Sequence, residues 1–119
     1  MSEWWIKWTS GRSKDDVPAA VRLFCFAHAG GGAAAYRAWP ALLPSWFEVQ
    51  AAQLPGRAVR LREPPLHNLA AIAARLHAEL LPLLDRPFVL FGHSMGAVVA
   101  AEVCRRLEAH GDPGPAQLI

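Results

Sequence analysis

Short apolar runs alternate along this chain with longer segments in which apolar residues recur every three or four positions. The apolar runs predict buried strands over 21–27 and 87–91, and residues 47–53 form a weaker strand candidate between them. The helical spacing predicts one helix from 68 or 69 to 84 and another over 95–109. Because strands and helices alternate, we expect parallel strands joined by right-handed helical crossovers. The pattern therefore predicts an α/β fold in which helices flank a parallel sheet.

The ends of the two long helices carry their own signals. Asn68 is placed as an N-cap for the first helix, and Pro82 should strain its last turn. The second helix is apolar at almost every position through Cys104, which predicts burial on most of its sides. Gly111 is placed to cap the end of that helix.

The segments outside these elements are less regular. Residues 1–20 are interpreted as an irregular lead-in to a single domain over 21–119. The lead-in contains three tryptophans that favour anchoring on the domain surface over partner binding: Trp4, Trp5 and Trp8. A short or bent helix is expected over 33–43, because Pro40 interrupts it. The final residues, QLI, predict the start of another strand.

Composition narrows the class of protein. The chain has 119 residues, of which 53% are apolar, and this is enough for one small domain with a core. The formal charge is +2, and only 18% of the residues are charged. The one arginine cluster, at 57, 60 and 62, lies beside Glu63 and is typical of a solvated loop. We therefore expect no nucleic-acid partner.

Nothing in the sequence suggests export or membrane insertion. The first residues, MSEWWIKW, lack a positive leader and a long apolar stretch, and no run approaches the roughly 18 apolar residues of a membrane span. Cys25 and Cys104 fall in an apolar strand and an apolar helix, so we favour buried free thiols over a disulfide and expect no metal site. These features predict a cytoplasmic protein.

Candidate chemistry appears first in the G-x-S-x-G pentapeptide Gly92–Gly96, between a predicted strand and a predicted helix. A residue forced into a tight turn there needs neighbours without side chains, and both glycines meet that need. Ser94 would project above the sheet as a nucleophile, at a helix N-terminus that favours negative charge. The Met95 amide would be one donor of an oxyanion hole. The alternative is a plain strand-to-helix turn with an idle serine.

A second candidate is the glycine-rich segment His28-Ala29-Gly30-Gly31-Gly32, which follows the first strand. Glycines let the backbone approach a substrate carbonyl closely, and an amide near Ala29 would supply the second oxyanion donor. A phosphate cradle or a flexible turn remains an alternative, although the spacing of a dinucleotide-binding loop and the lysine of a P-loop are absent. If the other two strands flank the first, the glycine-rich segment and the serine turn meet at one crevice.

The acid and base that a nucleophilic serine requires are harder to find. His93 adjoins Ser94 but should point to the opposite face, and His28 is better suited to orienting its own loop. The other histidines, at 67, 77 and 110, are predicted to lie on the surface. Asp85 and Asp112 are turn or helix-end residues by position. No complete catalytic triad can be assembled from these residues.

Taken together, the chain resembles the type II thioesterases, the stand-alone editing enzymes of polyketide and nonribosomal peptide synthesis. The resemblance is carried by the early tryptophan segment, LFCFAHAGGGAAAYRAW, QLPGR with its REPP continuation, and RPFVLFGHSMGAVVAAEV. It implies an α/β-hydrolase fold and release of acyl groups from the phosphopantetheine arm of an acyl or peptidyl carrier protein, with no cofactor of the enzyme's own. Ser94 would be the nucleophile, the Met95 and Ala29 amides the oxyanion hole, and His28, Gly30 and Gly31 part of the substrate-binding loop.

The resemblance also implies missing parts. Relatives are about twice as long, and their acid and base follow the serine, so we expect an N-terminal portion that ends before the later strands and the lid. Such a portion would be nearly inactive alone and would expose a sheet edge. Thioesterases that release fatty acids are close relatives of this family. Two rival interpretations remain: another esterase of the α/β-hydrolase class, and a non-catalytic half-domain that binds a carrier protein or complements a second chain.

Overall fold

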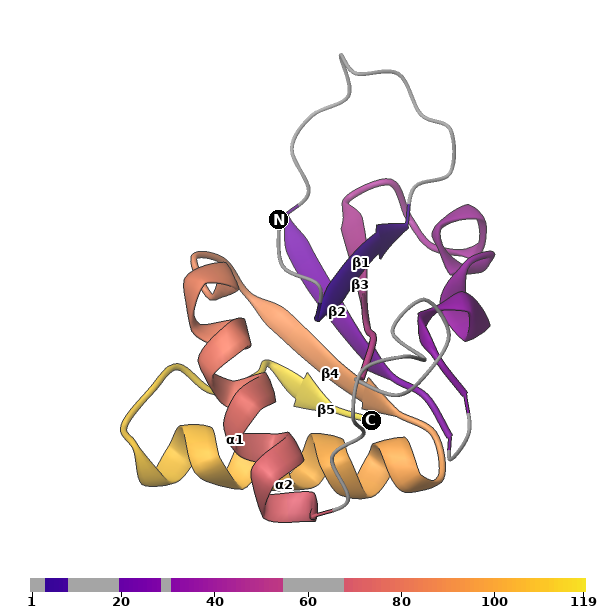
Figure 1. The fold of residues 1–119 in the computed structure, drawn as a ribbon. Helices are drawn as coiled ribbons and strands as arrows, with labels where there is room; N and C mark the ends of the chain where they lie inside the picture. The colour runs from indigo at the N-terminus through magenta and orange to yellow at the C-terminus, as the bar shows by residue number, and fades with distance from the viewer. Residues whose placement is uncertain (1–3, 9–19, 29–30, 55–67) are drawn as a thin grey trace.

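The computed structural model describes residues 4–8, 20–28, 31–54 and 68–119. Its strands are β1 (Trp5–Trp8), β2 (Val21–Phe26), β3 (Phe47–Ala52), β4 (Phe88–Gly92) and β5 (Gln117–Leu118). Its α-helices are α1 (Leu69–Leu80) and α2 (Met95–Ala109), and its short 3-10 helices are η1 (Ala33–Tyr36), η2 (Trp39–Leu42) and η4 (Leu81–Leu83) (Figure 1). The three predicted strands, both long helices and the final short strand are confirmed.

The strands form one mixed sheet in the order β1-β3-β2-β4-β5. β2 lies at the centre and pairs in parallel with β3 and β4, and β5 adds in parallel to β4. The prediction that the first strand is flanked by the other two is therefore confirmed. β1 pairs antiparallel with β3, so the expectation of an irregular lead-in is wrong for Trp5–Trp8. Trp4 and Trp5 are buried in the core, so they anchor this segment to the domain, as predicted, and do so below its surface.

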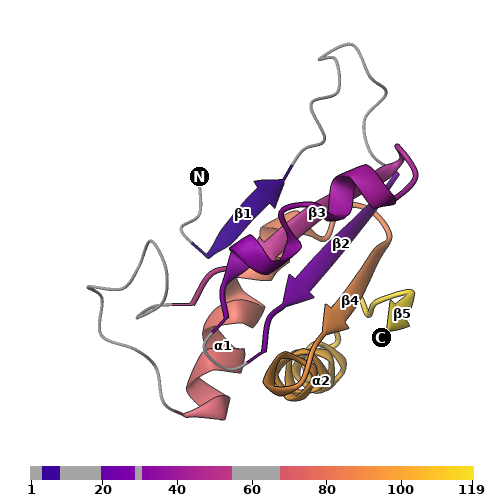
Figure 2. The same cartoon turned by 90° about the vertical axis from the view of Figure 1, so that its right-hand side faces the viewer.

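The two faces of the sheet have different covers. One face packs five apolar side chains against α1 and α2: Phe24, Phe26, Ala52, Phe88 and Leu90. The opposite face packs Leu23, Cys25, Val49 and Ala51 against Ala33 and Tyr36 of η1. Figure 2 shows α1 and α2 on one side of the sheet and the short helices on the other. This alternation of neighbouring residues between the two faces is the period of two that a strand imposes.

The helix ends follow their sequence signals. Oδ1 of Asn68 accepts hydrogen bonds from the amides of Ala70 (2.8 Å) and Ala71 (3.2 Å), which confirms the predicted N-cap. At the other end of the domain, Gly111 has φ +69°, and the amide of Asp112 donates to the carbonyl of Leu107. These features form a Schellman motif, which closes α2 at the predicted glycine.

Three expectations about helices are corrected. The segment 33–43 forms two 3-10 helices, because Pro40 lacks the amide that a continuous helix needs but fits the first turn of η2. α1 ends at Leu80, and Pro82 lies in the 3-10 turn that follows. α2 buries one face only, and the side chain of Val98 is 54% exposed, so burial on most sides is wrong.

One histidine lies in a different environment from the one predicted. His77 is buried between the two long helices, and its Nε2 lies 2.7 Å from Oδ2 of Asp112. Its ring also meets the ring of His110 edge-on, with 4.9 Å between centroids. Only the chain reversal after α2 brings Asp112 back onto α1, so the expectation of a surface position fails for His77. It holds for the exposed His110, and His67 lies outside the described residues.

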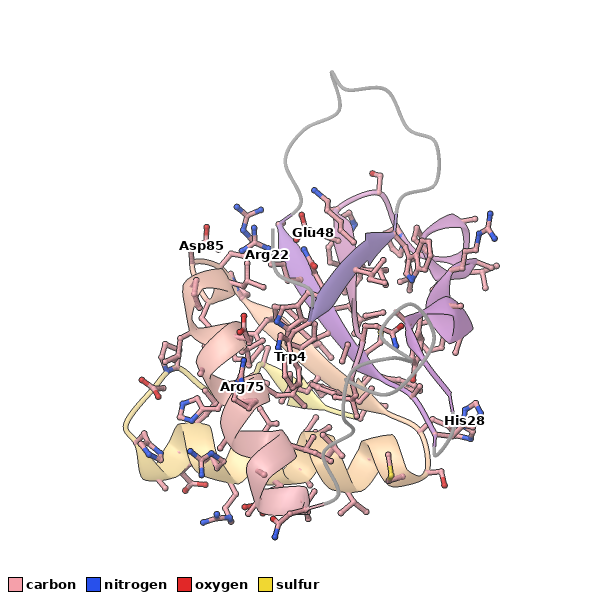
Figure 3. The ribbon with its side chains drawn as sticks, in the orientation of Figure 1. Trp4, Arg22, His28, Glu48, Arg75 and Asp85 are labelled. Carbon is pink, nitrogen blue, oxygen red and sulfur yellow. The ribbon has the colours of Figure 1, made fainter. Side chains whose placement is uncertain are left out.

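A charge within the central strand is accommodated by an ion-pair network. Arg22 contacts Glu48 at 2.6 Å, donates to the Leu83 carbonyl at 2.9 Å and pairs with Asp85 (Figure 3). Lys7 adds a further ion pair to Glu48 at 3.0 Å. Burial alone would raise the pKa of Glu48, but its hydrogen bonds with Gln50, Lys7 and Arg22 outweigh burial and lower it. The network lies where β2 begins, at the opposite end from the serine turn.

The described part of the chain has neither a membrane-spanning helix nor a disulfide. None of its helices is long and apolar enough to cross a membrane. Cys25 and Cys104 are free thiols, as predicted, with Cys25 buried and Cys104 half-buried.

Candidate active site

Ser94 occupies a strained turn between the end of β4 and the start of α2. Its backbone has φ 58° and ψ −118°, and it is the one non-glycine residue with positive φ among the residues described. Such a conformation costs on the order of 1–3 kcal/mol and persists only where the surrounding structure enforces it. The turn leaves Ser94 exposed at the carboxyl edge of the sheet. The elbow that the sequence predicted is therefore present.

The two glycines of the pentapeptide are required by close backbone approach. A Cβ at Gly92 would lie 2.3 Å from the carbonyl oxygen of Gly96. A Cβ at Gly96 would lie 2.0 Å from the carbonyl oxygen of Phe26, on the neighbouring strand. Neither backbone atom can rotate away as a side chain would. The spacing of the pentapeptide thus follows from how tightly the turn is packed between β2 and α2.

The first turn of α2 presents an amide beside Ser94. The amides of Gly96 and Ala97 donate to the carbonyls of His93 (3.0 Å) and Ser94 (2.9 Å). The Met95 amide has no acceptor among the described residues. It opens a 15-residue helix, whose N-terminus carries a partial positive charge. An amide in this position can stabilise negative charge that develops next to Ser94.

The end of β2 is fastened directly to this turn. The carbonyl oxygen of Phe26 accepts hydrogen bonds from the His93 amide (3.0 Å) and from the Tyr36 hydroxyl (2.8 Å). Burial, together with the nearby Cys25, raises the pKa of Tyr36 to about 12, so this hydroxyl remains a donor. The serine turn and the start of the glycine-rich segment are therefore held in a set relation, as the topology predicted.

Within the glycine-rich segment, the structure places His28 and Gly31 close to the serine turn. The rings of His28 and His93 meet edge-on at 5.6 Å between centroids, and both side chains are exposed. A Cβ at Gly31 would come within 2.9 Å of the His28 ring, so the backbone of Gly31 packs directly against that ring. Figure 3 shows His28 at the opposite end of the sheet from the Arg22 network. Ala29 and Gly30 lie outside the described residues.

An apolar hollow opens beside these elements. Gly31 and Met95 contribute to its wall, and apolar residues from the ends of β2 and β3 complete it, among them Phe26, Ala52 and Leu54. The hollow is shallow and open, and the space over it amounts to about 300 Å³ when the adjoining solvent is included. The hollow begins at Met95, the residue after Ser94, and its apolar wall suits an aliphatic group.

A histidine–carboxylate pair does not lie beside Ser94 among the described residues. The His77–Asp112 pair is found at the far end of α2, some 20 Å away at 1.5 Å per helical residue. His28 and His93 lie within the glycine-rich segment and the serine turn, and no described carboxylate pairs with either. Nor do the described residues include a cluster of three or more ligands suited to a metal ion.

Sequence reasoning missed two residues that support this edge of the sheet. Oε1 of the buried Gln53 accepts from the Ala33 amide at 3.0 Å, and the Trp8 indole donates to the Ala33 carbonyl at 2.8 Å. Both contacts join segments at least 20 residues apart in sequence. The available signal was a polar residue, Gln53, directly after the apolar pair Ala51-Ala52.

A strained serine at a strand-to-helix turn of a largely parallel sheet is the nucleophile-elbow arrangement of the α/β-hydrolases. Comparison with known proteins agrees. Residues 21–119 match the thioesterase domain family, and the chain therefore belongs to that family. It is 42% identical over 100 residues to the gramicidin S biosynthesis protein GrsT of Aneurinibacillus migulanus, covering 84% of this chain and 39% of GrsT.

Solved structures show the same likeness. The type II thioesterase BorB from the borrelidin biosynthetic cluster superposes with a TM-score of 0.78 at 38% identity, over 92% of this chain and 42% of BorB. The RedJ thioesterase of the prodiginine pathway in Streptomyces coelicolor gives a TM-score of 0.80 at 38% identity, over 90% of this chain and 42% of RedJ. The chain thus spans about two fifths of the length of these relatives. The predicted fold and the resemblance to type II thioesterases are confirmed.

Proposed function

We propose that the protein containing this chain is a serine thioesterase that hydrolyses acyl thioesters carried on the phosphopantetheine of acyl or peptidyl carrier proteins. One observation carries the proposal: Ser94 is held in a strained conformation beside the Met95 amide and an apolar hollow. The names of the relatives support the thioester class. GrsT is described as a gramicidin S biosynthesis protein, and BorB as a type II thioesterase.

In the proposed reaction, Ser94 Oγ attacks the thioester carbonyl carbon while a base accepts the hydroxyl proton. The carbonyl π electrons move to the oxygen, where the amides of Met95 and Ala29 stabilise the charge. Collapse breaks the carbon–sulfur bond, and the thiol leaves after taking the proton from the base. Water then repeats the addition on the acyl-serine and releases the carboxylic acid. We assign the acid and base to residues outside this chain.

Residues of the glycine-rich segment would form part of the acyl site. His28, Gly30 and Gly31 would line the approach of the acyl group, with Gly31 in the wall of the hollow. The proposed reaction uses a serine nucleophile and amide donors, so it needs no metal. The enzyme also needs no cofactor of its own, because the phosphopantetheine arrives with the substrate. Two free thiols are compatible with a reducing compartment, and we therefore place the enzyme in the cytoplasm beside its synthase.

The first experiment tests the nucleophile in the full-length protein. A fluorophosphonate probe should label Ser94 alone, as mapped by peptide mass spectrometry, and Ser94→Ala should abolish both labelling and turnover. Labelling at another residue would refute the assignment of the nucleophile.

The second experiment tests the substrate class. Turnover of carrier-protein thioesters is compared with turnover of oxygen esters bearing the same acyl chain, and thioesters should be preferred. A preference for oxygen esters would assign the protein to another esterase class. Carrier-protein binding without labelling or turnover would identify a non-catalytic binding domain instead.

A further inference from the structure

Ala33 is the first residue of η1 and directly follows the glycine-rich segment. Both its amide and its carbonyl form hydrogen bonds with side chains that are distant in sequence. Its amide donates to Oε1 of Gln53, and its carbonyl accepts from Nε1 of Trp8. Ala33 has no exposed surface, and Gln53 is only 1% exposed. The bond from Gln53 is buried and the bond from Trp8 is partly buried, and hydrogen bonds shielded from water are costly to lose. Ala33 is fastened to the ends of β1 and β3.

We propose that Gln53 and Trp8 are positioning residues that hold the glycine-rich segment in place opposite Ser94. The proposal rests on the proposed function, in which that segment supplies an oxyanion donor and part of the acyl site. Gly31, two residues before Ala33, lines the hollow together with Met95. A displacement at Ala33 is therefore transmitted to the wall that faces the serine turn.

The composition of the segment explains why it needs such support. Glycine loses more conformational freedom on ordering than any other residue, and three glycines in succession precede Ala33. Oxyanion donors are effective only when they are oriented before the reaction begins. The N-cap residue of η1, Gly32, offers no side-chain acceptor, and Gln53, the residue that follows β3, provides one.

The same glutamine also links the two faces of the sheet. Its neighbours Ala52 and Leu54 both line the hollow, on the face of the sheet that packs against α1 and α2. Gln53 itself reaches Ala33, which belongs to the cluster on the opposite face. A movement of the end of β3 is therefore coupled to the end of the glycine-rich segment. An apolar side chain of similar size would fill the space but lose this coupling.

The tryptophans of β1 provide a matched test in the full-length protein. Trp8→Phe removes the indole donor to Ala33, and Trp5→Phe removes an equivalent indole donor to the Glu79 carbonyl (3.3 Å), which lies on α1. Both variants keep an aromatic ring. We expect Trp8→Phe to lower kcat for thioester hydrolysis by about 10- to 100-fold with little change in KM, the size of effect that a misplaced site produces. Trp5→Phe should retain kcat.

Variants of the glutamine test the other bond. Gln53→Met should lower kcat by a similar factor, while Gln53→Glu keeps an oxygen opposite the Ala33 amide and should retain more of kcat. Because both bonds hold the same residue, the losses in Trp8→Phe and Gln53→Met should be less than additive in the double variant. Equal kcat losses in Trp5→Phe and Trp8→Phe, or losses that only follow the melting temperature, would reduce these residues to a structural role.

A readout without substrate separates this proposal from the proposed function. Hydrogen exchange in peptides covering 27–36 should be faster in Gln53→Met than in the unmodified protein, whichever substrate the enzyme takes. Unchanged exchange would refute the restraint at Ala33. Faster exchange with unchanged kcat would refute the positioning role. Full thioester turnover in Ser94→Ala would instead refute the proposed function and leave the exchange result standing.

Discussion

Replacing Gly96 by alanine tests the packing that holds the serine turn. The new Cβ would lie 2.0 Å from the Phe26 carbonyl oxygen and 2.5 Å from its carbonyl carbon. That oxygen already accepts hydrogen bonds from the His93 amide and the Tyr36 hydroxyl, so it cannot withdraw without breaking them. Overpacking of this kind costs about 1–3 kcal/mol and sometimes more, and a rigid backbone contact belongs at the upper end of the range.

A gain partly offsets that cost. Alanine is better than glycine within a helix by about 1 kcal/mol, and Gly96 lies in the first turn of α2. The net destabilisation of Gly96→Ala should therefore be about 2 kcal/mol or more, a large fraction of the stability of a typical domain. Moving α2 away from β2 also displaces Ser94 and Met95, so fluorophosphonate labelling should slow at temperatures where the variant is folded.

The measurement is urea denaturation of the full-length protein, with Gly114→Ala as the matched control. A Cβ at Gly114 meets no atom within 4 Å, and its φ lies outside the left-handed region, so the control should be neutral or slightly stabilising. If Gly96→Ala unfolds at the same urea concentration as Gly114→Ala and labels Ser94 at the same rate, close packing does not hold the turn.

Three further predictions concern stability. The pKa of Glu48 is lower in the folded protein than in the unfolded chain, so its carboxylate stabilises the fold above the unfolded pKa of about 4.3, and this stabilisation is lost as the pH falls through the folded pKa. Glu48→Gln should therefore make the free energy of unfolding less dependent on pH in this acidic range. An unchanged pH profile of unfolding would contradict this. Asn68→Ala should cost about 1 kcal/mol through the lost N-cap of α1, measured by thermal unfolding. Gly111→Ala should cost about 1–2 kcal/mol, because φ +69° is strained for alanine although the space is open.

The features that sequence alone determined are those set by neighbouring residues. Apolar runs and helical spacing located β2, β3, β4 and both long helices, because the period of a strand or a helix is local. Asn68 and Gly111 marked helix ends for the same reason, since each bonds within its own turn. The pentapeptide around Ser94 also belongs here, since the need for glycine can be inferred from the tightness of a strand-to-helix turn.

Tertiary structure decided the features that depend on contacts between distant segments. Trp5–Trp8 became a strand only because the edge of β3 was free to pair with it. His77 became buried because Asp112, 35 residues later, returns to meet it. Gln53 looked like an ordinary polar residue at the end of the predicted strand 47–53, yet it holds Ala33, 20 residues earlier.

The physical reason is the same in each case. Whether a side chain is buried, and which donor it meets, depends on where other elements pack, and a local pattern carries no record of that packing. The serine turn shows both levels in one place. Its sequence specified a sharp turn with small neighbours, whereas the position of the Phe26 carbonyl on the neighbouring strand made glycine obligatory at Gly96.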